Sequence, residues 1–222
     1  MTSFPTSLEP VTRLLPLDSM GANNMQVAQK LSERGYEVRV GLTPELADQI
    51  EVMARETSIR EFCPNDSGGR FADRASMELW LSKQRATFVL INKIHENEDD
   101  LRLVGYGWVG LGTSPHVHGG ETTFALRVGE AGQGQGLATP FAQLIIAGSA
   151  AIYGARNMWL ETWQSNAAAV HVYHKVGFVD VNQEPSERPA NNGDRVPDVR
   201  LYMSFPNESL PTINDAALSS DS

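Results

Sequence analysis

The chain has 222 residues, of which 41% are hydrophobic and 20% charged, and its formal net charge is −9. This length suits one well-buried domain, and the acidic balance argues against nucleic acid as a partner, because nucleic-acid binders usually carry a basic surface. The lone cysteine, Cys63, excludes a disulfide within the chain and a cysteine zinc cluster. There is no run of 18 apolar residues and no evident secretory signal, so we expect a cytoplasmic protein with no membrane contact.

The two ends of the chain differ from its middle in composition. Residues 1–18 contain three prolines and show no sustained period, which predicts an arm, and residues 206–222 are rich in Ser, Asn and Asp, which predicts a disordered tail. We therefore expect an N-terminal extension, residues 1–35, that contains a helix, followed by one domain over residues 36–205.

Helical and strand patterns alternate along the middle of the chain, which predicts a mixed α/β domain. The predicted helices cover Ala22–Arg34, residues 45–57, Ser76–Arg85, Leu137–Tyr153 and Ala167–Val176. The predicted strands cover Tyr36–Val40, Thr87–Ile94, Leu101–Gly112, Glu121–Val128, Asn157–Thr162, Phe178–Asn182 and Val199–Phe205. Two polar segments are expected to be a turn, His95–Asp100, and a mobile loop, Gln183–Pro197.

The segment from Gly132 to Ala138, Gly-Gln-Gly-Gln-Gly-Leu-Ala, lies between a predicted strand and a predicted helix. A helix N-terminus leaves amide hydrogens unpaired and carries a partial positive charge, and glycine lets the backbone approach a phosphate closely. Together these features predict an anion site that needs no basic side chain.

Three kinds of turn are compatible with the glycines alone. A nucleoside-triphosphate loop would end in Gly-Lys-Ser/Thr, and Gly136-Leu137-Ala138 excludes it. A dinucleotide-binding turn fits poorly, because its last glycine position falls on Leu137 or Thr139, although Glu161 could imitate the acid that binds the ribose. A tight connection without a ligand is the third reading.

A second motif, Asn166-Ala-Ala-Ala-Val-His-Val-Tyr173-His-Lys175-Val-Gly177-Phe178, follows one helix and one strand later. Its Asn, Tyr, Lys, Gly and Phe resemble the second signature of the GCN5-related N-acetyltransferase (GNAT) superfamily. Gln133, Gly136 and Ala138 resemble the first signature of that family, which is Gln or Arg, two residues, Gly, one residue, then Gly or Ala. The resemblance runs from about residue 36 to residue 205 and is tightest over residues 121–178.

The resemblance implies an α+β fold: a mixed, twisted, mostly antiparallel sheet of six to seven strands, flanked by about four helices. It implies acetyl-CoA as co-substrate, no metal, and a cofactor that lies where the strands Glu121–Val128 and Asn157–Thr162 splay apart. The implied cofactor-binding residues form three groups. Strand residues pair with the pantetheine arm (Leu126, Arg127, Val128), and turn residues face the pyrophosphate (Gln133, Gly134, Gln135, Gly136, Leu137, Ala138, Thr139). The third group is Asn166 and Tyr173 of the second motif.

The resemblance also suggests catalytic roles. Tyr173 is the candidate acid that protonates the departing thiolate, and Asn166 is expected to bond the pantetheine arm, to cap its helix, or both. Glu121 is the first candidate for the general base and Glu161 the second. His116 and His118 could titrate near neutrality, although solvated loop histidines are the preferred interpretation.

The sequence does not identify the acceptor substrate. The loop of residues 60–74 is expected to shape its pocket, where Asp66 or Asp73 could attract an amine and Arg70 could hold a carboxylate, or these side chains could simply be solvated. The leading hypothesis is an N-acetyltransferase that acts by direct attack of a primary amine of a small molecule, peptide or protein. The alternative is a non-catalytic acyl-CoA-binding module of the same fold, and a homodimer is compatible with either.

Overall fold

The computed structural model describes residues 7–9, 11–93, 101–154, 156–190 and 193–206. The predicted turn His95–Asp100 and nearly all of the predicted tail, residues 207–222, lie outside the described residues. The strands are β1 (Arg13–Leu14), β2 (Tyr36–Val40), β3 (Arg85–Asn92), β4 (Arg102–Leu111), β5 (Thr122–Val128), β6 (Met158–Trp163), β7 (Val179–Pro189) and β8 (Arg195–Phe205).

Most helices fall close to where the hydrophobic periodicity and the capping residues predict them, but the helix Thr57–Phe62 was not predicted. Thr43 caps one of them by accepting a hydrogen bond from the amide of Leu46 at 3.3 Å, and Pro44 stands at its first position. The helices are α1 (Ala22–Glu33), α2 (Pro44–Met53), α3 (Thr57–Phe62), α4 (Arg74–Leu81), α5 (Ala138–Tyr153) and α6 (Ala167–Lys175), with short turns η1 (Leu17–Ser19), η2 (Asp66–Arg70, a π-helical turn) and η3 (Glu130–Gly132).

All eight strands belong to one sheet in the order β1-β2-β3-β4-β5-β6-β8-β7. Within the described chain, the neighbours are antiparallel except for β5 and β6. The fold class predicted from the sequence is confirmed, but the sheet has eight strands and not six or seven. The extra strand is β1, from the segment predicted to be an arm, which pairs with β2 through Arg13 opposite Val40.

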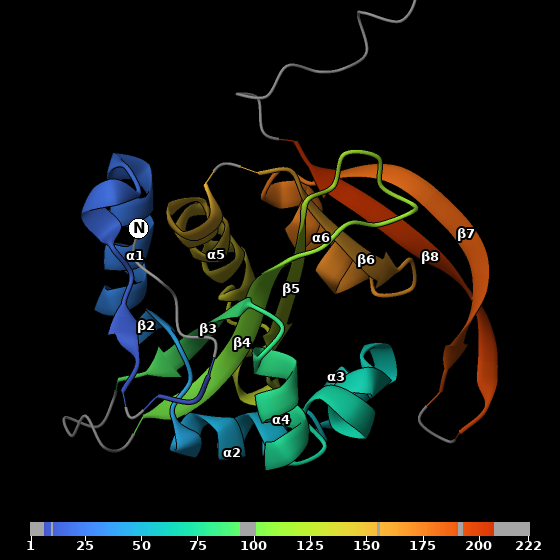
Figure 1. Cartoon of the computed structure of the whole chain (residues 1–222), viewed down its shortest axis with the longest axis horizontal. Helices are drawn as coiled ribbons and strands as arrows, with labels where there is room; N and C mark the ends of the chain where they lie inside the picture. Colours follow the sequence, from blue (N-terminus) through green and yellow to red (C-terminus); the bar gives the residue numbers. More distant parts are fainter. Residues whose placement is uncertain (1–6, 10, 94–100, 155, 191–192, 207–222) are drawn as a thin grey trace, which may run out of the picture.

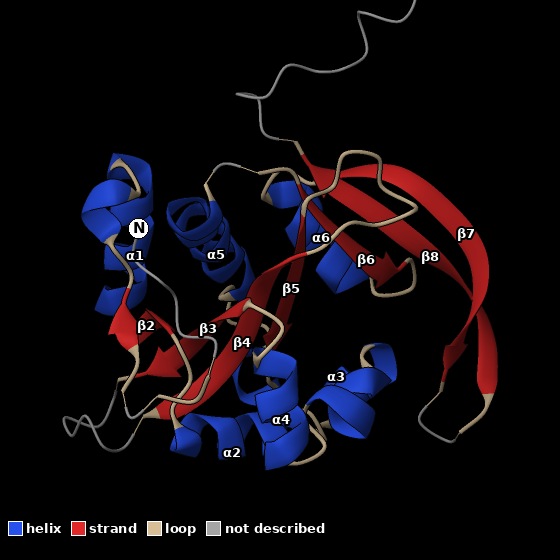
Figure 2. Cartoon of the chain, in the orientation of Figure 1, coloured by secondary structure: helices blue, strands red, loops and turns tan. Residues whose placement is uncertain are grey.

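Helices cover both faces of the sheet (Figure 1). We call them the α5 face, covered by α1, α5 and α6, and the α3 face, covered by α2, α3 and α4 (Figure 2). Each face has its own apolar core: Phe88, Phe141 and Ile145 are fully buried on the α5 face, and Ile50 and Met77 on the α3 face. The site therefore has to form where the sheet itself opens between these two cores.

The sheet opens between β5 and β6. These strands pair at only two positions, Thr122 with Met158 and Thr123 with Trp159, although both continue beyond them. The separation of the two strands is visible in Figure 1. We call the region in which β5 and β6 run apart without pairing the gap.

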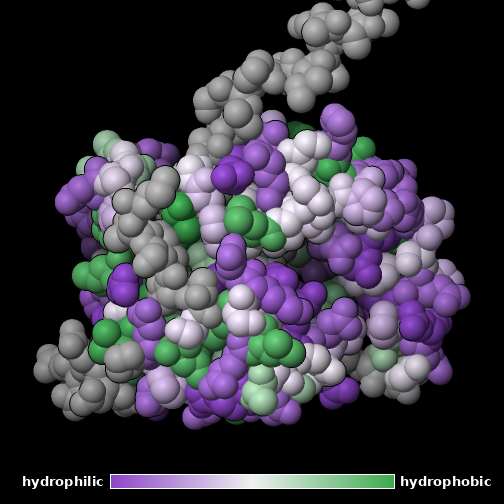
Figure 3. Space-filling model, viewed as in Figure 1, coloured by the Kyte–Doolittle hydropathy of each residue, from purple (hydrophilic) through white to green (hydrophobic). Residues whose placement is uncertain are grey.

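The prediction of a mobile loop over residues 183–197 was wrong. β7 and β8 form a long antiparallel hairpin, paired from Val179 opposite Ser204 to Pro189 opposite Arg195. Hydrophilic residues cover this side of the molecule in Figure 3. Because β7 is an edge strand with mostly exposed residues, it lacks the alternation of apolar and polar residues that reveals a strand, and an edge position tolerates proline.

The far end of the hairpin rests on α3. The guanidinium of Arg188 donates to the carbonyl of Glu61 at 3.1 Å and to the carboxylate of Asp198 at 3.2 Å, and it lies 4.9 Å from the ring centre of Phe62. The hairpin therefore closes over the α3 face on the side of β6.

Candidate active site at the splayed strands

Two glycines shape the turn between β5 and α5. Gly134 and Gly136 have φ angles of 73° and 69°, in the left-handed region that other residues rarely adopt. A Cβ atom at either position would meet nothing within 4 Å, so the backbone angle and not crowding requires glycine here. Successive amides in such alternating conformations form a concave anion-binding nest.

The start of α5 adds further amide donors to this nest. The Phe141 amide, which donates to the Leu137 carbonyl at 3.1 Å, is the first to join the ladder of the helix, and no side chain caps the helix among the described residues. The amides of Ala138 and Thr139 precede this ladder, and Pro140 has no amide hydrogen. The local geometry thus fits the pyrophosphate site predicted from the sequence.

The glutamine side chains of the turn hold it in place. Gln133 donates through Nε2 to the Ser58 hydroxyl at 2.9 Å and to the Val128 carbonyl at 3.1 Å. Gln135 donates to the Ala131 carbonyl at 2.6 Å. Both amides are engaged within the protein, so the backbone of the turn, and not these side chains, presents the donors to an anion.

The backbone of β5 alternates between its two neighbours. The Gly129 amide donates to Val104 of β4 at 2.9 Å, whereas the Thr122 amide donates to Asn157, just before β6, at 3.2 Å. Even-numbered residues of β5 therefore direct their backbone groups toward β6. Leu126 and Val128 do so beyond the point where β6 parts from β5, so two of the three predicted pantetheine-binding positions face the gap.

The backbone of the third position, Arg127, faces β4 instead. A Cβ atom built on Gly105 of β4 would lie 2.6 Å from the Arg127 carbonyl oxygen, which shows how closely the two backbones approach. Its side chain donates a hydrogen bond through Nη1 to the Leu126 carbonyl, which is directed toward the gap, at 2.8 Å. Arg127 therefore belongs to the site through its guanidinium, and a charged residue within an apolar strand is the sequence signal for such a role.

Tyr173 belongs to the apolar core of the α5 face. It comes from α6, is 95% buried, and packs edge-on against Phe124 and Phe178 at ring-centre distances of 6.1 and 6.0 Å. Burial raises the pKa of the phenol to about 12, an effect that the positive charge of Arg127 partly offsets. Because its pKa is raised, the phenol stays protonated at neutral pH.

Asn166 caps α6 by accepting a hydrogen bond from the Ala169 amide at 3.3 Å, which confirms one of its two predicted roles. Its contact with the pantetheine arm stays a prediction. Cys63 lies half-buried near Arg127, and burial raises the pKa of its thiol, so the group is neutral and unsuited to nucleophilic attack.

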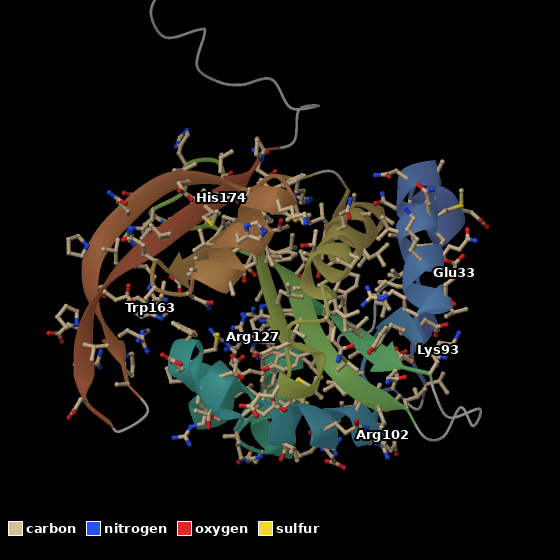
Figure 4. All side chains as sticks on the ribbon, turned by 180° about the vertical axis from the view of Figure 1, so that it is seen from behind. Glu33, Lys93, Arg102, Arg127, Trp163 and His174 are labelled. Carbon is tan, nitrogen blue, oxygen red and sulfur yellow. The ribbon has the colours of Figure 1, made fainter. Side chains whose placement is uncertain are left out.

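Arg127, labelled in Figure 4, belongs to a buried ion network on the α3 face. The Asp66 carboxylate is fully buried and accepts hydrogen bonds from Arg127 Nε, Arg70 Nη1 and the Tyr106 hydroxyl, each at 2.9 Å. Burial alone would disfavour the charged guanidinium of Arg127, but Asp66 outweighs it and raises the Arg127 pKa. The Arg127 guanidinium also stacks on Trp108 at 5.1 Å.

This network changes the predictions for the segment of residues 60–74. It is not a loop, because α3 and the turn η2 occupy most of it. Asp66 already binds two guanidinium groups, so the expectation that it attracts an amine was wrong, and Arg70 is likewise paired. Asp73 caps α4 by accepting from the Ser76 amide at 2.8 Å, and this hydrogen bond lowers its pKa.

Glu121, the first candidate for the base, lies just before β5, at the end where β5 and β6 remain paired. Its carboxylate accepts from Arg156 at 3.2 Å and from the Asn157 amide at 3.3 Å. Six residues of extended strand separate it from Arg127, about 20 Å at the usual rise. The structure therefore does not bring Glu121 beside Arg127, and its catalytic role stays a prediction.

Glu161, the second candidate, projects on the α3 face of β6 directly opposite Tyr202 of β8. Tyr202 stacks on His116 at a ring-centre distance of 4.2 Å, and His116 Nδ1 lies 2.9 Å from the Glu184 carboxylate. His116 is thus not a solvated loop histidine as preferred from sequence, whereas His118 is exposed. We call the group His116, Glu161, Glu184 and Tyr202 the hairpin cluster. It could not be predicted from the sequence, because its residues come from four separate segments.

The acetyltransferase (GNAT) family model matches residues 52–178, which is more than half of the chain and includes the turn, the gap and Tyr173. The chain belongs to this family. It is an acetyl-CoA-dependent acyltransferase, and the dinucleotide-binding interpretation of the turn is thereby superseded. No curated protein matches the sequence significantly.

Solved structures share the fold at low sequence identity. The spermidine N-acetyltransferase of Vibrio cholerae, in complex with CoA and spermine, is 19% identical with a TM-score of 0.59, covering 78% of this chain and 98% of that one. The ribosomal-protein-S5-alanine acetyltransferase of Vibrio fischeri is 15% identical with a TM-score of 0.57, covering 79% and 94%. A GCN5-related N-acetyltransferase of Kribbella flavida is 19% identical with a TM-score of 0.56, covering 78% and 99%. At these identities the likeness shows the fold and does not choose among acceptors.

Two further findings bear on the site. Within the described part of the chain, no helix is long and apolar enough to cross a membrane. The same residues include no group of three or more His, Cys, Asp or Glu side chains that could hold a metal ion.

Proposed function

We propose that this acyltransferase moves the acetyl group to a primary amine by direct attack at the gap between β5 and β6. The observation that carries the proposal is the position of Tyr173, whose ring packs edge-on against Phe124 of β5, the strand that parts from β6. Burial keeps the phenol protonated at neutral pH, so it can donate a hydrogen bond to the departing thiolate. Because a thiol, with a usual pKa of about 8.5, is the stronger acid, the proton moves to the sulfur only if the phenol is reprotonated in the same step.

The acceptor amine is proposed to approach from the α3 face, beneath the β7–β8 hairpin. Glu184 of the hairpin cluster lies there, as does Glu161, which forms an ion pair with Arg200 at 3.8 Å, and the net charge of −9 favours a cationic partner. The Vibrio cholerae relative, solved with spermine, makes a polyamine the first acceptor class to try. The Vibrio fischeri enzyme, named for ribosomal protein S5 alanine, makes a peptide amino terminus the second.

In the proposed steps the acceptor nitrogen loses two protons. A base removes the first from the ammonium, and the free amine nitrogen attacks the thioester carbonyl carbon to give a tetrahedral intermediate. The C–S bond then breaks as the nitrogen loses its second proton; Tyr173 gives its proton to the departing sulfur, and the phenol is reprotonated, through water, by the proton that leaves the nitrogen. The base is proposed to be Glu121 or Glu161, and His116 is added as a third candidate because it lies beside Tyr202, opposite Glu161.

The test is an assay of the purified protein with acetyl-CoA and a panel of polyamines, amino acids and peptides, with the acetylated product detected by mass spectrometry. Tyr173→Phe should lower kcat about 100-fold, as expected for loss of a general acid, and leave the Kd for acetyl-CoA within about threefold. Tyr153→Phe is the matched control, because it removes another partly buried phenol, one that donates to the Gln84 carbonyl at 2.8 Å.

Separate outcomes decide between the enzyme and the non-catalytic module. Tight binding of acetyl-CoA without turnover of any amine in the panel would favour the module. Glu121→Gln, Glu161→Gln and His116→Gln then identify the base, because the variant that lacks it should lose the rising limb of the pH–rate profile.

A further inference from the structure

The N-terminal extension contacts the glycine-rich turn directly. Arg34, which follows α1, donates through Nη2 to the carbonyl of Gln135 at 2.6 Å. The hydroxyl of Tyr36, at the start of β2, donates to the side-chain oxygen of Gln135 at 2.7 Å. α1 itself packs along α5, so the whole extension lies on the same side as the helix that begins at the turn.

Nothing within the turn itself supplies a cation. The segment from Gly129 to Thr139 contains no lysine or arginine. On the side of α3 the neighbouring charges are negative, since the Glu130 amide donates to the Glu56 carboxylate at 2.7 Å and the Glu130 carboxylate accepts from the Ser58 amide at 3.4 Å. CoA brings a pyrophosphate and a 3′-phosphate to a protein whose net charge is −9. Backbone amides alone would have to offset this repulsion.

The guanidinium of Arg34 is suited to contact a phosphate group. It is exposed, and it lies 5.9 Å from the ring centre of Tyr36, which limits its orientations. The hydrogen bond to Gln135 uses one of several N–H donors of a planar group whose geometry matches phosphate oxygens. Its partner, the Gln135 carbonyl, stands between the two positive-φ glycines, so the charge is fixed at the edge of the anion nest.

We propose that Arg34 binds a phosphate group of CoA, so that the N-terminal extension completes the cofactor site. The proposal rests on the assignment of acetyl-CoA as co-substrate, and it assigns a function to a segment that precedes the residues matched by the family model. Tyr36 acts as a positioning residue, because it holds Gln135 and flanks the guanidinium.

The experiment measures the Kd of acetyl-CoA by isothermal titration calorimetry for the wild type, Arg34→Ala, Arg34→Gln and Arg34→Lys. Loss of one charge-assisted contact at an exposed site should weaken binding about tenfold in the Ala and Gln variants. The Lys variant should stay within about threefold of the wild type. Arg13→Ala is the matched control, because it removes the same charge from the same extension at the opposite end of β2 and should leave the Kd unchanged.

Binding of 3′-dephospho-CoA identifies the phosphate. If Arg34→Ala weakens CoA but not 3′-dephospho-CoA, the 3′-phosphate is the partner, and if it weakens both equally, the pyrophosphate is. Wild-type affinity in Arg34→Gln, or a loss in Arg34→Lys as large as in Arg34→Ala, would overturn the proposal, because charge would then not matter. Failure of the wild type to bind acetyl-CoA at all would instead contradict the cofactor assignment.

Discussion

The proposed cofactor side and the proposed acceptor side of this molecule are built by different means. The cofactor side consists of the turn, the start of α5 and the edge of β5, and it presents mainly backbone groups whose geometry a few local residues determine. The acceptor side consists of α3, η2 and the β7–β8 hairpin, and side chains from distant segments hold it together. The first can be recognised from short motifs, whereas the second exists only after the chain has folded.

The difference has a consequence for specificity. Backbone amides at Gly134 and Gly136 suit a phosphate whatever the acceptor is, so this side can stay the same among enzymes with different substrates. The hairpin cluster and the contacts of Arg188 with Glu61 and Asp198 depend on individual side chains. The acceptor side is therefore where the sequences of relatives can diverge.

The strongest way to break the acceptor side is to remove Asp66. Asp66→Ala leaves the guanidinium of Arg127 buried without its counter-ion and should lower the free energy of unfolding by about 3–5 kcal/mol. Urea denaturation followed by tryptophan fluorescence measures this change. Asp180→Ala, which removes an exposed carboxylate paired with His174, should show no resolved change.

A double variant checks the cause of that loss. Because a buried charge without its partner is what destabilises the single variant, Asp66→Ala combined with Arg127→Met should be less unstable than the sum of the two single variants predicts. If the double variant is as unstable as the sum of the two single variants, the ion pair is not the origin of the effect.

The matching change on the cofactor side is Gly136→Ala. A Cβ atom at φ 69° costs about 1–2 kcal/mol, and the turn can relieve this strain by moving its amides away from the nest. We expect the Kd of acetyl-CoA to rise about tenfold while the KM of the amine changes little. Gly68→Ala, at a position where φ is not positive and nothing lies within 4 Å, should bind acetyl-CoA as the wild type does.

The same contrast explains what sequence could predict. Gly134, Gly136 and the Asn166 cap act within a few residues, so their spacing predicts the turn and the start of α6. The ends of α5 and α6 also agree with the structure within one residue. A ladder of local amides needs no information from the rest of the chain.

The acceptor side lacked such local signals. The contacts of Asp66 with Tyr106 and Arg127 join three segments 40 and 61 residues apart, and no spacing rule connects them. Pro185, Pro189 and the polar residues of β7 imitate a loop, because an edge strand exposed to solvent needs no apolar alternation. Arg34 carries no local signal for a similar reason, since its partner Gln135 lies 101 positions further along the chain.

A smaller effect is expected from releasing the hairpin. Arg188→Ala removes the ion pairs to Glu61 and Asp198, and it should raise the KM of the amine about fivefold, equivalent to about 1 kcal/mol, with the KM of acetyl-CoA unchanged. Steady-state kinetics with either substrate varied measures both constants. Arg195→Ala, near the tip of the same hairpin, is the control and should change neither, and a rise in both constants for Arg188→Ala would show that the two sides are not independent.

The smallest expected change is in the shape of the pH–rate profile, and it concerns Tyr173. A tyrosine is neutral when protonated, and burial penalises the phenolate, so the pKa rises to about 12 from its ordinary value of about 10. The donor is therefore intact throughout the neutral range and is lost only as the pH rises through about 12. We expect Tyr173→Phe to lower kcat by a similar factor from pH 7 to pH 10, without moving the alkaline limb of the profile. An alkaline limb near pH 10 that disappears in Tyr173→Phe would mean that the phenol is solvated, and that the gap between β5 and β6 does not exclude water from the acid.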